Sequence, residues 1–340
     1  MRIGNCDLAD EVYIIAEIGG NHNGNADAAF RLVDEAAKTG VNAVKFQTYS
    51  AERLVHPGLE PLPIVRKNYK TQLERFKSLE LSDATYEKIM EQCKDLGVDF
   101  MTTPFDLQIL EKFSQQMPAI KIASGDLTFQ PLIDAAIKKG KPVILSTGMS
   151  TEADIDQAIR SLSTDRIMLL HCVSVYPLPD ELVNLQSIPY MQQRWPNIPI
   201  GYSDHSIGNE ACMAAVAMGA RLIEKHFTLD CEQRPGDHVL SADPQQMKAL
   251  VTSVRRISKM RGSWKKAPAE QEDSMRQWMR RGIYAARDIP LGTRLTIDDL
   301  LFIRPVACYA PGRWEELLGK KTARTVVALE AVTPDLLDLQ

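Results

Sequence analysis

The amino-acid sequence predicts an α/β protein in which a (β/α)8 TIM barrel precedes a small second domain. Three observations indicate this arrangement: eight short apolar runs, helical periodicity between most of them, and a change of composition near residue 262. Parallel strands buried on both faces read as continuous apolar runs. Eight alternating units fit a closed barrel better than an open doubly wound sheet.

The eight apolar runs are rich in β-branched residues. The predicted strands are residues 12–17, 42–47, 98–103, 119–124, 142–147, 166–171, 198–203 and 221–226. Helical periodicity between them predicts helices over 26–38, 83–96, 132–139, 152–162 and 209–218. Several of these segments end in a glycine suited to the position after a helix: Gly40, Gly97, Gly140 and Gly219. One long connection, about 50–81, contains His56, Pro57, Pro61 and Pro63 and lies on the side where such barrels carry their active sites.

The C-terminal part has a different composition. Residues 263–281 are charged and carry no strand signal, so we predict a linker with a helical turn or two. Residues 282–340 show short strand-like runs and a turn at Pro290, Leu291 and Gly292. The predicted domains are therefore a catalytic barrel over 1–262, a linker over 263–281 and a second domain over 282–340. A domain of roughly 60 residues is only marginally stable alone, so we expect it to pack on the barrel or on a partner chain.

Charge and cysteine usage narrow the class of protein. The net charge of -4 and the pI near 5.9 argue against a protein built mainly to hold nucleic acid or anionic lipid. The six cysteines are scattered, without a CxxC pair, which is typical of reduced thiols in a cytosolic protein. The N-terminus lacks the pattern of a signal peptide, and no apolar stretch approaches the roughly 20 residues of a membrane span. We therefore predict a soluble cytoplasmic protein with neither a membrane nor a nucleic acid as partner.

Polar side chains follow the apolar runs, at the point where each predicted strand ends. The segments are AEIGGNHNG, VKFQT, TTPFD, KIASGD, LSTGM, LHCVSVYP, GYSDHS and IEKHF. Residues at the carboxyl ends of barrel strands face the catalytic mouth. Eight such endings in succession predict an active site at this end of the barrel.

Two lysines, Lys45 and Lys121, lie within otherwise apolar strands. A buried ammonium group requires a partner. One alternative is a salt bridge to Glu17 or Asp126, and a second is a Schiff-base lysine. The interpretation we favour is an anion site, in which both lysines bind the phosphate and carboxylate groups of a substrate. Hydroxyl groups that could assist are those of Ser124, Ser146 and Thr147.

His205 and His226 end neighbouring predicted strands, so their imidazoles can converge over the barrel. Two neutral imidazoles with open coordination positions suit Mn²⁺, Co²⁺, Fe²⁺ or Zn²⁺. Glu17, at the end of the first strand, is the best carboxylate for positioning or proton transfer. Three further residues close to the histidines in sequence could orient ligands or bind substrate hydroxyls: Asp204, Asp237 and His238.

The motifs, in this order and spacing, resemble those of the sialic acid synthase family, also called N-acetylneuraminate or nonulosonic acid synthases. The segments that carry the resemblance are AEIGGNHNG, AVKFQTY, KIASGD, LSTGM, LHCVSVYP, GYSDH and EKHFTLD. The C-terminal segment GIYAARDIPLGTRLTIDDLLFIRP is similar to the family's antifreeze-like (SAF) β-clip domain. The resemblance covers nearly the whole chain. It implies a transferase that condenses phosphoenolpyruvate with an open-chain N-acylated hexosamine, such as N-acetylmannosamine, and releases phosphate.

The resemblance also implies roles for matching residues. Glu17 would lie near the reacting carbons, and His205 and His226 would bind Mn²⁺ or another divalent cation such as Co²⁺ or Mg²⁺. Arg304 would reach the active site of the partner in a domain-swapped homodimer. The residues expected to hold phosphoenolpyruvate are Lys45, Thr103, Lys121, Ser124, Ser146 and Ser203. Those expected to contact the sugar, or otherwise to line the substrate site, are Gln47, Phe105, Asp126, Ser174, Tyr176 and Asp237.

Three positions depart from the family pattern. Asp126 stands where glutamate is common, Ser174 stands where asparagine is common, and 306–308 reads Val-Ala-Cys in place of Gly-Thr-Gly. These departures predict that the reaction is retained and that the acceptor differs from plain N-acetylmannosamine. Alternatives are a 2,4-diacetamido sugar (a legionaminate or pseudaminate synthase), a non-acylated or phosphorylated sugar, or a non-catalytic protein of spore-coat or surface-polysaccharide biosynthesis. The joint presence of the lysines, Glu17 and the two histidines argues against a non-catalytic protein.

Overall fold

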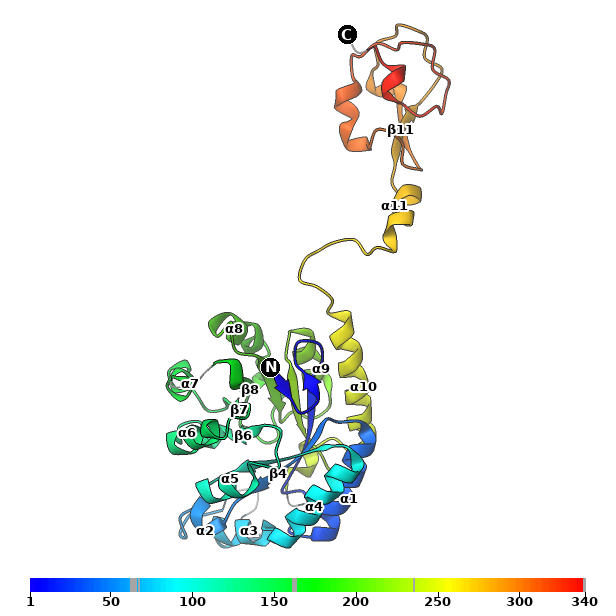
Figure 1. Ribbon diagram of the computed structural model, residues 1–340. Helices are drawn as coiled ribbons and strands as arrows, with labels where there is room; N and C mark the ends of the chain where they lie inside the picture. The colour runs from blue at the N-terminus through cyan, green and yellow to red at the C-terminus, as the bar shows by residue number, and fades with distance from the viewer. Residues whose placement is uncertain (62–65, 67, 161–163, 235, 339–340) are drawn as a thin grey trace. The chain divides into compact units, whose positions relative to one another are not determined.

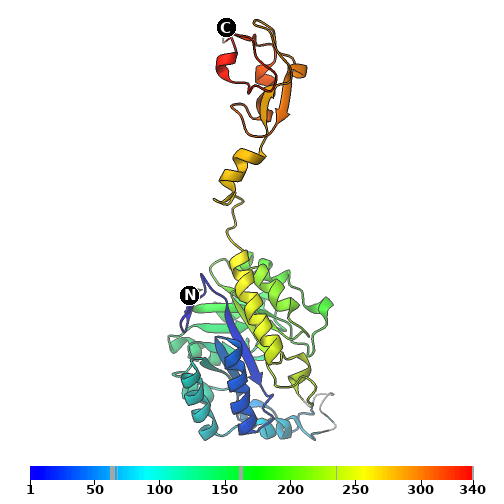
Figure 2. The ribbon, with the colours of Figure 1, turned by 90° about the vertical axis from the view of Figure 1, so that its right-hand side faces the viewer.

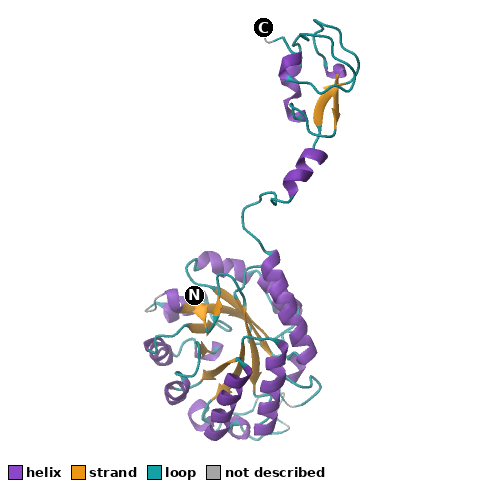
Figure 3. Ribbon diagram, turned by 45° about the vertical axis from the view of Figure 1, so that its right-hand side comes forward, coloured by secondary structure: helices purple, strands orange, loops and turns teal. Residues whose placement is uncertain are grey.

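The computed structural model describes residues 1–340 except 62–65, 67, 161–163, 235 and 339–340. The chain forms two compact units, Met1–Gly262 and Ser263–Gln340. In the first unit, a cylinder of strands lies inside a ring of helices (Figures 1 and 3). Among the described residues, no helix is both long and apolar enough to cross a membrane.

Eight parallel strands build the first unit. They are β3 (Tyr13–Gly19), β4 (Ala43–Thr48), β5 (Asp99–Pro104), β6 (Ile120–Ile122), β7 (Val143–Ser146), β8 (Ile167–Cys172), β9 (Ile200–Asp204) and β10 (Leu222–His226). Their hydrogen-bonded order is β5-β4-β3-β10-β9-β8-β7-β6, and the two end strands, β5 and β6, also lie side by side. Every predicted strand is present, and the predicted (β/α)8 barrel is confirmed.

Helices surround the strands. They are α1 (Ala26–Thr39), α2 (Ala51–Leu54), α3 (Gln72–Leu79), α4 (Asp83–Leu96), α5 (Leu107–Phe113), α6 (Gln130–Lys138), α7 (Glu152–Ile159), α8 (Ser187–Arg194), α9 (Glu210–Ala217) and α10 (Pro244–Met260). The five predicted helices correspond to α1, α4, α6, α7 and α9. Residues 161 and 162 of the fourth prediction lie outside the described residues. The long connection 50–81 contains α2 and α3, while its residues 62–65 and 67 also lie outside.

Local sequence explains where these helices begin and end. The side chain of Asn25 accepts a hydrogen bond from the backbone of Ala28 at the start of α1, which satisfies one of the free N–H groups of the first turn. Gly40 ends α1 with φ of 85°, a left-handed conformation that glycine adopts without a steric penalty. Helix α10 packs against both α1 and α9, so the last helix of the barrel covers the seam between first and last strands (Figure 2).

The barrel interior changes character along its axis. Successive side chains of a strand point to opposite faces, so alternate residues of each strand point into the barrel. At the amino end these inward residues are apolar, and a hairpin of β1 (Arg2–Ile3) and β2 (Cys6–Asp7) closes that end by packing Ile3 and Leu8 against them. The inward residues it covers include Tyr13, Ile15, Ala43, Met101, Ile144, Met168 and Leu222. Polar residues replace them at the carboxyl end.

The second unit has its own small core. Helix α11 (Glu272–Met279) precedes two antiparallel strands, β11 (Gly282–Ala285) and β12 (Leu300–Ile303). The rest of the described chain in this unit consists of loops, isolated bridges and 3-10 turns such as Pro311–Leu317. The core that these segments enclose contains Ile283, Ile289, Leu295, Leu317, Val326 and Leu336.

Candidate active site

A cluster of four charged side chains fills the carboxyl end of the barrel interior. Glu17 on β3, Lys45 on β4, Lys121 on β6 and Glu224 on β10 all point inward, and each is at most 6% exposed. Glu17 pairs in register with Lys45 on one side and with His226 on the other. Glu224 lies two residues before His226 on β10, so it points to the same face of that strand. Charges buried this deeply are stable only when they are paired.

Lys45 is held by two carboxylates and a hydroxyl group. Its Nζ atom lies 2.5 Å from Oε2 of Glu17 and 3.6 Å from Oε2 of Glu224. It also donates a hydrogen bond to Oγ1 of Thr103 at 3.0 Å. The salt bridge to Glu17 considered from the sequence is therefore present.

Lys121 bonds Ser146, a hydroxyl group suggested from the sequence, but its carboxylate partner is a residue that the sequence did not suggest. Its Nζ atom donates to Oγ of Ser146 at 2.7 Å and lies 3.7 Å from Oε1 of Glu224. No salt bridge joins it to Asp126 in the described chain, where Oδ2 of Asp126 is buried without a hydrogen-bond partner. Glu224 is the partner of both lysines because strand order brings β10 across the barrel from β6, which local sequence does not reveal.

Burial and charge pairing have opposite effects on the pKa values of the residues in this cluster. Burial raises the pKa of Glu17, although Lys45 opposes the shift. Burial also lowers the pKa of Lys121, with Glu224 opposing. For Glu224 burial works against ionisation, but Lys121 and Lys45 outweigh it and hold its pKa low. Glu17 is therefore the carboxyl group of the cluster best suited to carry a proton.

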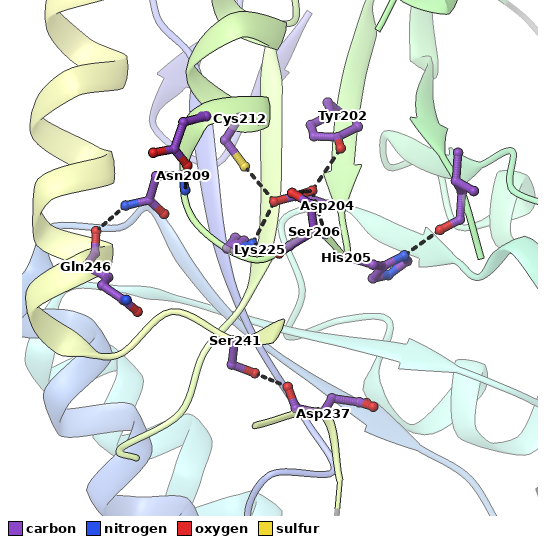
Figure 4. A network of polar contacts seen from close by, with 12 residues as sticks. Tyr202, Asp204, His205, Ser206, Asn209, Cys212, Lys225, Asp237, Ser241 and Gln246 are labelled. Carbon is purple, nitrogen blue, oxygen red and sulfur yellow. Dashed lines mark hydrogen bonds and ion pairs between the residues drawn. The ribbon is translucent and has the colours of Figure 1, made fainter. Parts of the chain in front are cut away.

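His205 and His226 lie above the charged cluster with their ring centroids 5.5 Å apart. Nδ1 of His205 lies 2.8 Å from the carbonyl oxygen of Val173 (Figure 4). Because a carbonyl only accepts, this contact places the proton on Nδ1 and leaves a lone pair on Nε2. His226 is buried, and burial lowers its pKa, although Asp237 opposes the shift, so that the neutral ring is favoured. Its Nδ1 atom has no hydrogen-bond partner among the residues that the structure describes.

This pair of imidazoles fits a divalent cation. Neutral imidazole is the form that binds metal, and a backbone carbonyl that orients the other ring nitrogen is a common feature of histidine ligands. The orphaned nitrogen of His226 is a second feature that a bound ion would satisfy. In the described part of the chain, no group of three or more histidine, cysteine, aspartate or glutamate side chains is placed to hold a metal ion. Water or substrate would therefore supply the remaining ligands.

The loops after β6, β7 and β8 approach one another closely beside the cluster. Oγ of Ser124 accepts a hydrogen bond from the backbone N–H of Gly148 at 3.0 Å. A Cβ atom at Gly148 would lie 2.4 Å from Oγ of Ser174 and 2.8 Å from Oγ of Ser124. A larger residue at this position would displace both hydroxyl groups. Ser124 and Ser174 are therefore brought together, whereas the hydroxyl group of Thr147 is bonded to the backbone of Leu170.

Two other predicted residues, Gln47 and Ser203, contact the cluster, and two more, Tyr176 and Phe105, pack against other rings. Gln47 donates to Oε1 of Glu17 at 3.0 Å, and Ser203 donates to Oε1 of Glu224 at 3.0 Å. The ring of Tyr176 lies 4.0 Å from the ring of His205, measured between centroids. Phe105 packs edge-on against Tyr49, at 5.8 Å between centroids.

Two further candidates, Asp204 and His238, lie outside the charged cluster, and Arg304 lies in the second unit. Asp204 points away from the barrel interior and forms a buried ion pair with Lys225 (Figure 4). Nδ1 of His238 lies 2.7 Å from Oγ1 of Thr228. Arg304 is exposed within the second unit, where its Nη1 atom lies 3.7 Å from Sδ of Met279.

Sequence reasoning missed Glu224. The alternation of strand residues could have found it, because a residue two positions before an inward His226 on the same strand must also point inward.

Comparison with known proteins identifies the family. The model described as NeuB family matches residues 32–266, and the model described as SAF domain matches residues 280–338. The chain belongs to the NeuB family. The resemblance to sialic acid synthases with a C-terminal SAF domain is thereby confirmed.

Relatives of this NeuB-family chain match it over most of their length. An uncharacterized protein of Methanocaldococcus jannaschii is 44% identical over 300 residues, covering 87% of this chain and 86% of the relative. The N,N'-diacetyllegionaminic acid synthase of Legionella pneumophila is 36% identical over 327 residues, covering 93% and 92%. The solved structure of N-acetylneuraminic acid (sialic acid) synthetase from Leptospira borgpetersenii, in complex with citrate, has a TM-score of 0.72 and 34% identity, covering 81% of this chain and 94% of that one.

Proposed function

We propose that this protein is a nonulosonic acid synthase that joins phosphoenolpyruvate to an open-chain N-acylated hexosamine and releases phosphate. The observation that carries the proposal is the buried cluster of Lys45, Lys121, Glu17 and Glu224 beneath two converging imidazoles. The named relatives, a diacetyllegionaminic acid synthase and a sialic acid synthetase, make products of this chemical class.

The lysines form the binding site for the anionic donor. Lys45 and Lys121 would hold the phosphate and carboxylate groups of phosphoenolpyruvate, with the hydroxyl groups of Thr103 and Ser146 already bonded to them. Ser124 and Ser203 would complete the site. A proton on Glu17 would leave the cluster with a net positive charge, which favours a donor that carries several negative charges.

His205 and His226 would hold the divalent cation, for which two imidazoles favour Mn²⁺ or Co²⁺ over Mg²⁺. When bound, the cation would supply Lewis-acid polarisation of the aldehyde oxygen of the acceptor. The chain itself fixes the two rings by the bond from His205 to Val173 and by the burial of His226. The ring of Tyr176 lies tilted against His205, with 4.0 Å between centroids, and covers one side of that imidazole.

The remaining chemistry is positioning and proton transfer. C3 of phosphoenolpyruvate attacks the aldehyde carbon, water adds at C2, and the tetrahedral intermediate loses phosphate. Lysines fixed on the donor hold C3 in attack geometry, which is a large effect in reactions of two substrates. The attack creates an alkoxide that needs a proton, and the water that adds at C2 must lose one. Glu17 can serve both steps because burial raises its pKa and Gln47 orients one of its oxygens.

The acceptor is proposed to differ from plain N-acetylmannosamine. The two departures in the barrel are Ser174, whose hydroxyl group lies against Gly148, and Asp126, which ends the turn Ser124–Asp126. Gln47, Tyr176 and Asp237 would contact the sugar. A 2,4-diacylamino hexose is the acceptor that we favour, since the legionaminate relative is named for a product of that type. A phosphorylated or non-acylated sugar is the alternative.

We further propose that the enzyme is cytoplasmic and acts as a domain-swapped homodimer. The barrel over 1–262 would provide the catalytic cluster, and the linker over 263–281 would carry the SAF domain over 282–340. Arg304 supports this arrangement because it is an exposed cation without a carboxylate partner in the described part of its own unit. It would contact the acceptor bound by the partner subunit.

The proposed function is tested by a substrate screen with the purified full-length chain. Phosphoenolpyruvate and Mn²⁺ are incubated with N-acetylmannosamine, 2,4-diacetamido hexoses and their phosphates, and phosphate release is measured together with the mass of the product. Acceptor-dependent phosphate release with a nine-carbon product is expected. Absence of such a product with every acceptor and with Mn²⁺, Co²⁺ and Mg²⁺ would overturn the proposal. A wide preference for N-acetylmannosamine would overturn only the choice of acceptor.

A further inference from the structure

A buried ion pair lies on the outer face of the barrel, directly behind the two histidines. Lys225 on β10 is the cross-strand register partner of Asp204 on β9. Their side chains are 1% and 0% exposed, and Nζ of Lys225 lies 2.6 Å from Oδ2 of Asp204. Figure 4 shows both side chains between the strands and helix α9, on the side away from the barrel interior.

The ion pair is part of a network that encloses the segment carrying His205. Oδ1 of Asp204 accepts hydrogen bonds from the backbone N–H of Ser206 at 2.9 Å and from its hydroxyl group at 2.7 Å. Nζ of Lys225 donates to the carbonyl oxygen of Ser206 at 2.5 Å. The hydroxyl group of Tyr202 and the thiol of Cys212 also donate to the Asp204 carboxylate, at 2.8 and 3.4 Å.

These bonds fix the residues that point into the site. Because strand residues alternate between faces, His205 follows the outward Asp204 and His226 follows the outward Lys225. The contacts from Lys225 to Asp204 and Ser206 therefore tie β10 to β9 on either side of His205. Nδ1 of His226 lacks a hydrogen-bond partner among the described residues. The orientation of this ring thus depends on the position of its strand.

Stability alone is a weak reason for such a pair. A buried ion pair often contributes no more to folding than a well-packed apolar pair of similar volume. The Asp204 carboxylate nevertheless receives donors from three other residues as well as Lys225, which is more than a pairing of charges requires.

We propose that Asp204 and Lys225 are positioning residues that set the separation and orientation of His205 and His226. The importance of that separation for turnover rests on the proposed function. The positioning itself does not, because it can be measured on the imidazoles without substrate or metal.

The experiment compares Asp204→Asn, Lys225→Met and the double variant of both. The double variant removes both charges at once, so it avoids the uncompensated buried charge that either single variant leaves and that can prevent folding. In the double variant, asparagine retains an acceptor for Ser206, but the tie from β10 is lost. Thermal unfolding, the nitrogen NMR signals of the six histidines, the visible spectrum on titration with Co²⁺, and kcat are measured for each protein.

If the pair positions the rings, the double variant should keep a melting temperature near that of the wild type. The nitrogen signals of His205 and His226 should move, and those of His22 and His56 should not. The NMR spectra are recorded at one alkaline pH, where the imidazoles are neutral. Affinity for Co²⁺ and kcat are expected to fall about 10- to 100-fold, the usual effect of removing a group that orients a metal ligand. Tyr13→Phe is the matched control, since it removes a buried hydrogen bond to Asp99 at the amino end of the barrel.

Unchanged signals of His205 and His226 in the double variant would overturn the inference and show that the pair is structural. The inference also fails if Tyr13→Phe moves these signals as much. Loss of the proposed function is a separate result: if the wild type makes no product with any acceptor, the NMR comparison still decides whether the pair positions the rings.

Discussion

Oε2 of Glu17 lies 2.5 Å from Nζ of Lys45, and the two residues are register partners on adjacent strands at the carboxyl end of the barrel. The other carboxyl oxygen of Glu17 accepts a hydrogen bond from Gln47. The carboxyl group is thus held from two sides. Its pKa depends on how strongly the ammonium group of Lys45 interacts with it and how strongly with Glu224. A negatively charged donor bound at Lys45 would weaken this pairing and favour a proton on Glu17.

Replacement of this carboxyl group tests its role in proton transfer. Glu17→Gln retains hydrogen-bonding atoms of the same shape but carries no exchangeable carboxyl proton, while Lys45 keeps Glu224 at 3.6 Å. We expect kcat to fall about 10²- to 10⁴-fold, the usual contribution of a general acid or base. The KM for phosphoenolpyruvate should change little. Steady-state phosphate release measures both.

Asp99→Asn, at the amino end of the same barrel, is the control for an altered buried carboxylate. A fall in kcat of less than tenfold for Glu17→Gln, or an equal fall for Asp99→Asn, would contradict a role in proton transfer.

The metal site is tested by comparing a histidine that points into the barrel, His226, with one that points outward, His171. His226→Ala should abolish turnover and leave the melting temperature nearly unchanged, because the lost ring makes no hydrogen bond through Nδ1. His171 lies on β8, two strands from His226, and is also buried. Its Nε2 lies 2.8 Å from the carbonyl oxygen of Val183, and its ring stacks on Tyr202 on the outer face of the barrel. His171→Gln should therefore keep most of its activity. Substantial turnover by His226→Ala in excess Mn²⁺ would contradict the metal site.

The barrel could be predicted from sequence because its strands are buried on both faces and read as continuous apolar runs. Helices of weaker pattern were not predicted. Helix α5 has only seven residues, and α8 contains Pro189 near its start. Helix α10 follows the last strand, where no further strand marks its end, although Asp243 and Gln246 form a capping box there.

The residues of the candidate site could be predicted where they lie at strand ends. The pairs that they form could not be predicted where the two members are distant in sequence. Lys45, Lys121, His205 and His226 point into the barrel as expected, and these residues needed only the strand pattern. The carboxylate partner of Lys121, Glu224, was not predicted, because it lies 103 positions away on β10 and depends on barrel closure. The outward direction of Asp204 follows from strand alternation, but its pairing with Lys225 requires the register of β9 and β10.

Asp126 gives a prediction about stability and pH. Burial raises the pKa of Asp126 from 3.8 to about 6, although Lys121 opposes the shift. The folded protein therefore binds this proton more tightly than the unfolded chain. Stability from this group is present below pH 3.8 and is lost as the pH rises through 6. Asp126→Asn should consequently be neutral near pH 4 and stabilising above pH 6, by roughly 1 kcal/mol after allowing for partial exposure.

Thermal unfolding of the wild type and of Asp126→Asn across this pH range provides the measurement. Asp134→Asn, a change at a half-buried position of α6, serves as the control for loss of a carboxylate. A difference in melting temperature between wild type and Asp126→Asn that does not vary with pH would show that the Asp126 carboxyl group is not the source.

Combining an inactive variant, His226→Ala, with an impaired one, Arg304→Ala, tests whether Arg304 acts in the partner's site. In a domain-swapped dimer, a barrel from Arg304→Ala would receive an intact SAF domain from His226→Ala, and one complete site would form per hybrid. The two variants are co-expressed with different tags, and the mixed dimers are purified. These dimers should show the activity of one wild-type site per dimer. Arg304→Ala alone should raise the KM for the acceptor sugar far more than the KM for phosphoenolpyruvate, since a guanidinium group aimed at the sugar leaves the donor's lysines untouched. If purified hybrids are no more active than Arg304→Ala alone, the arginine acts within its own chain or not at all.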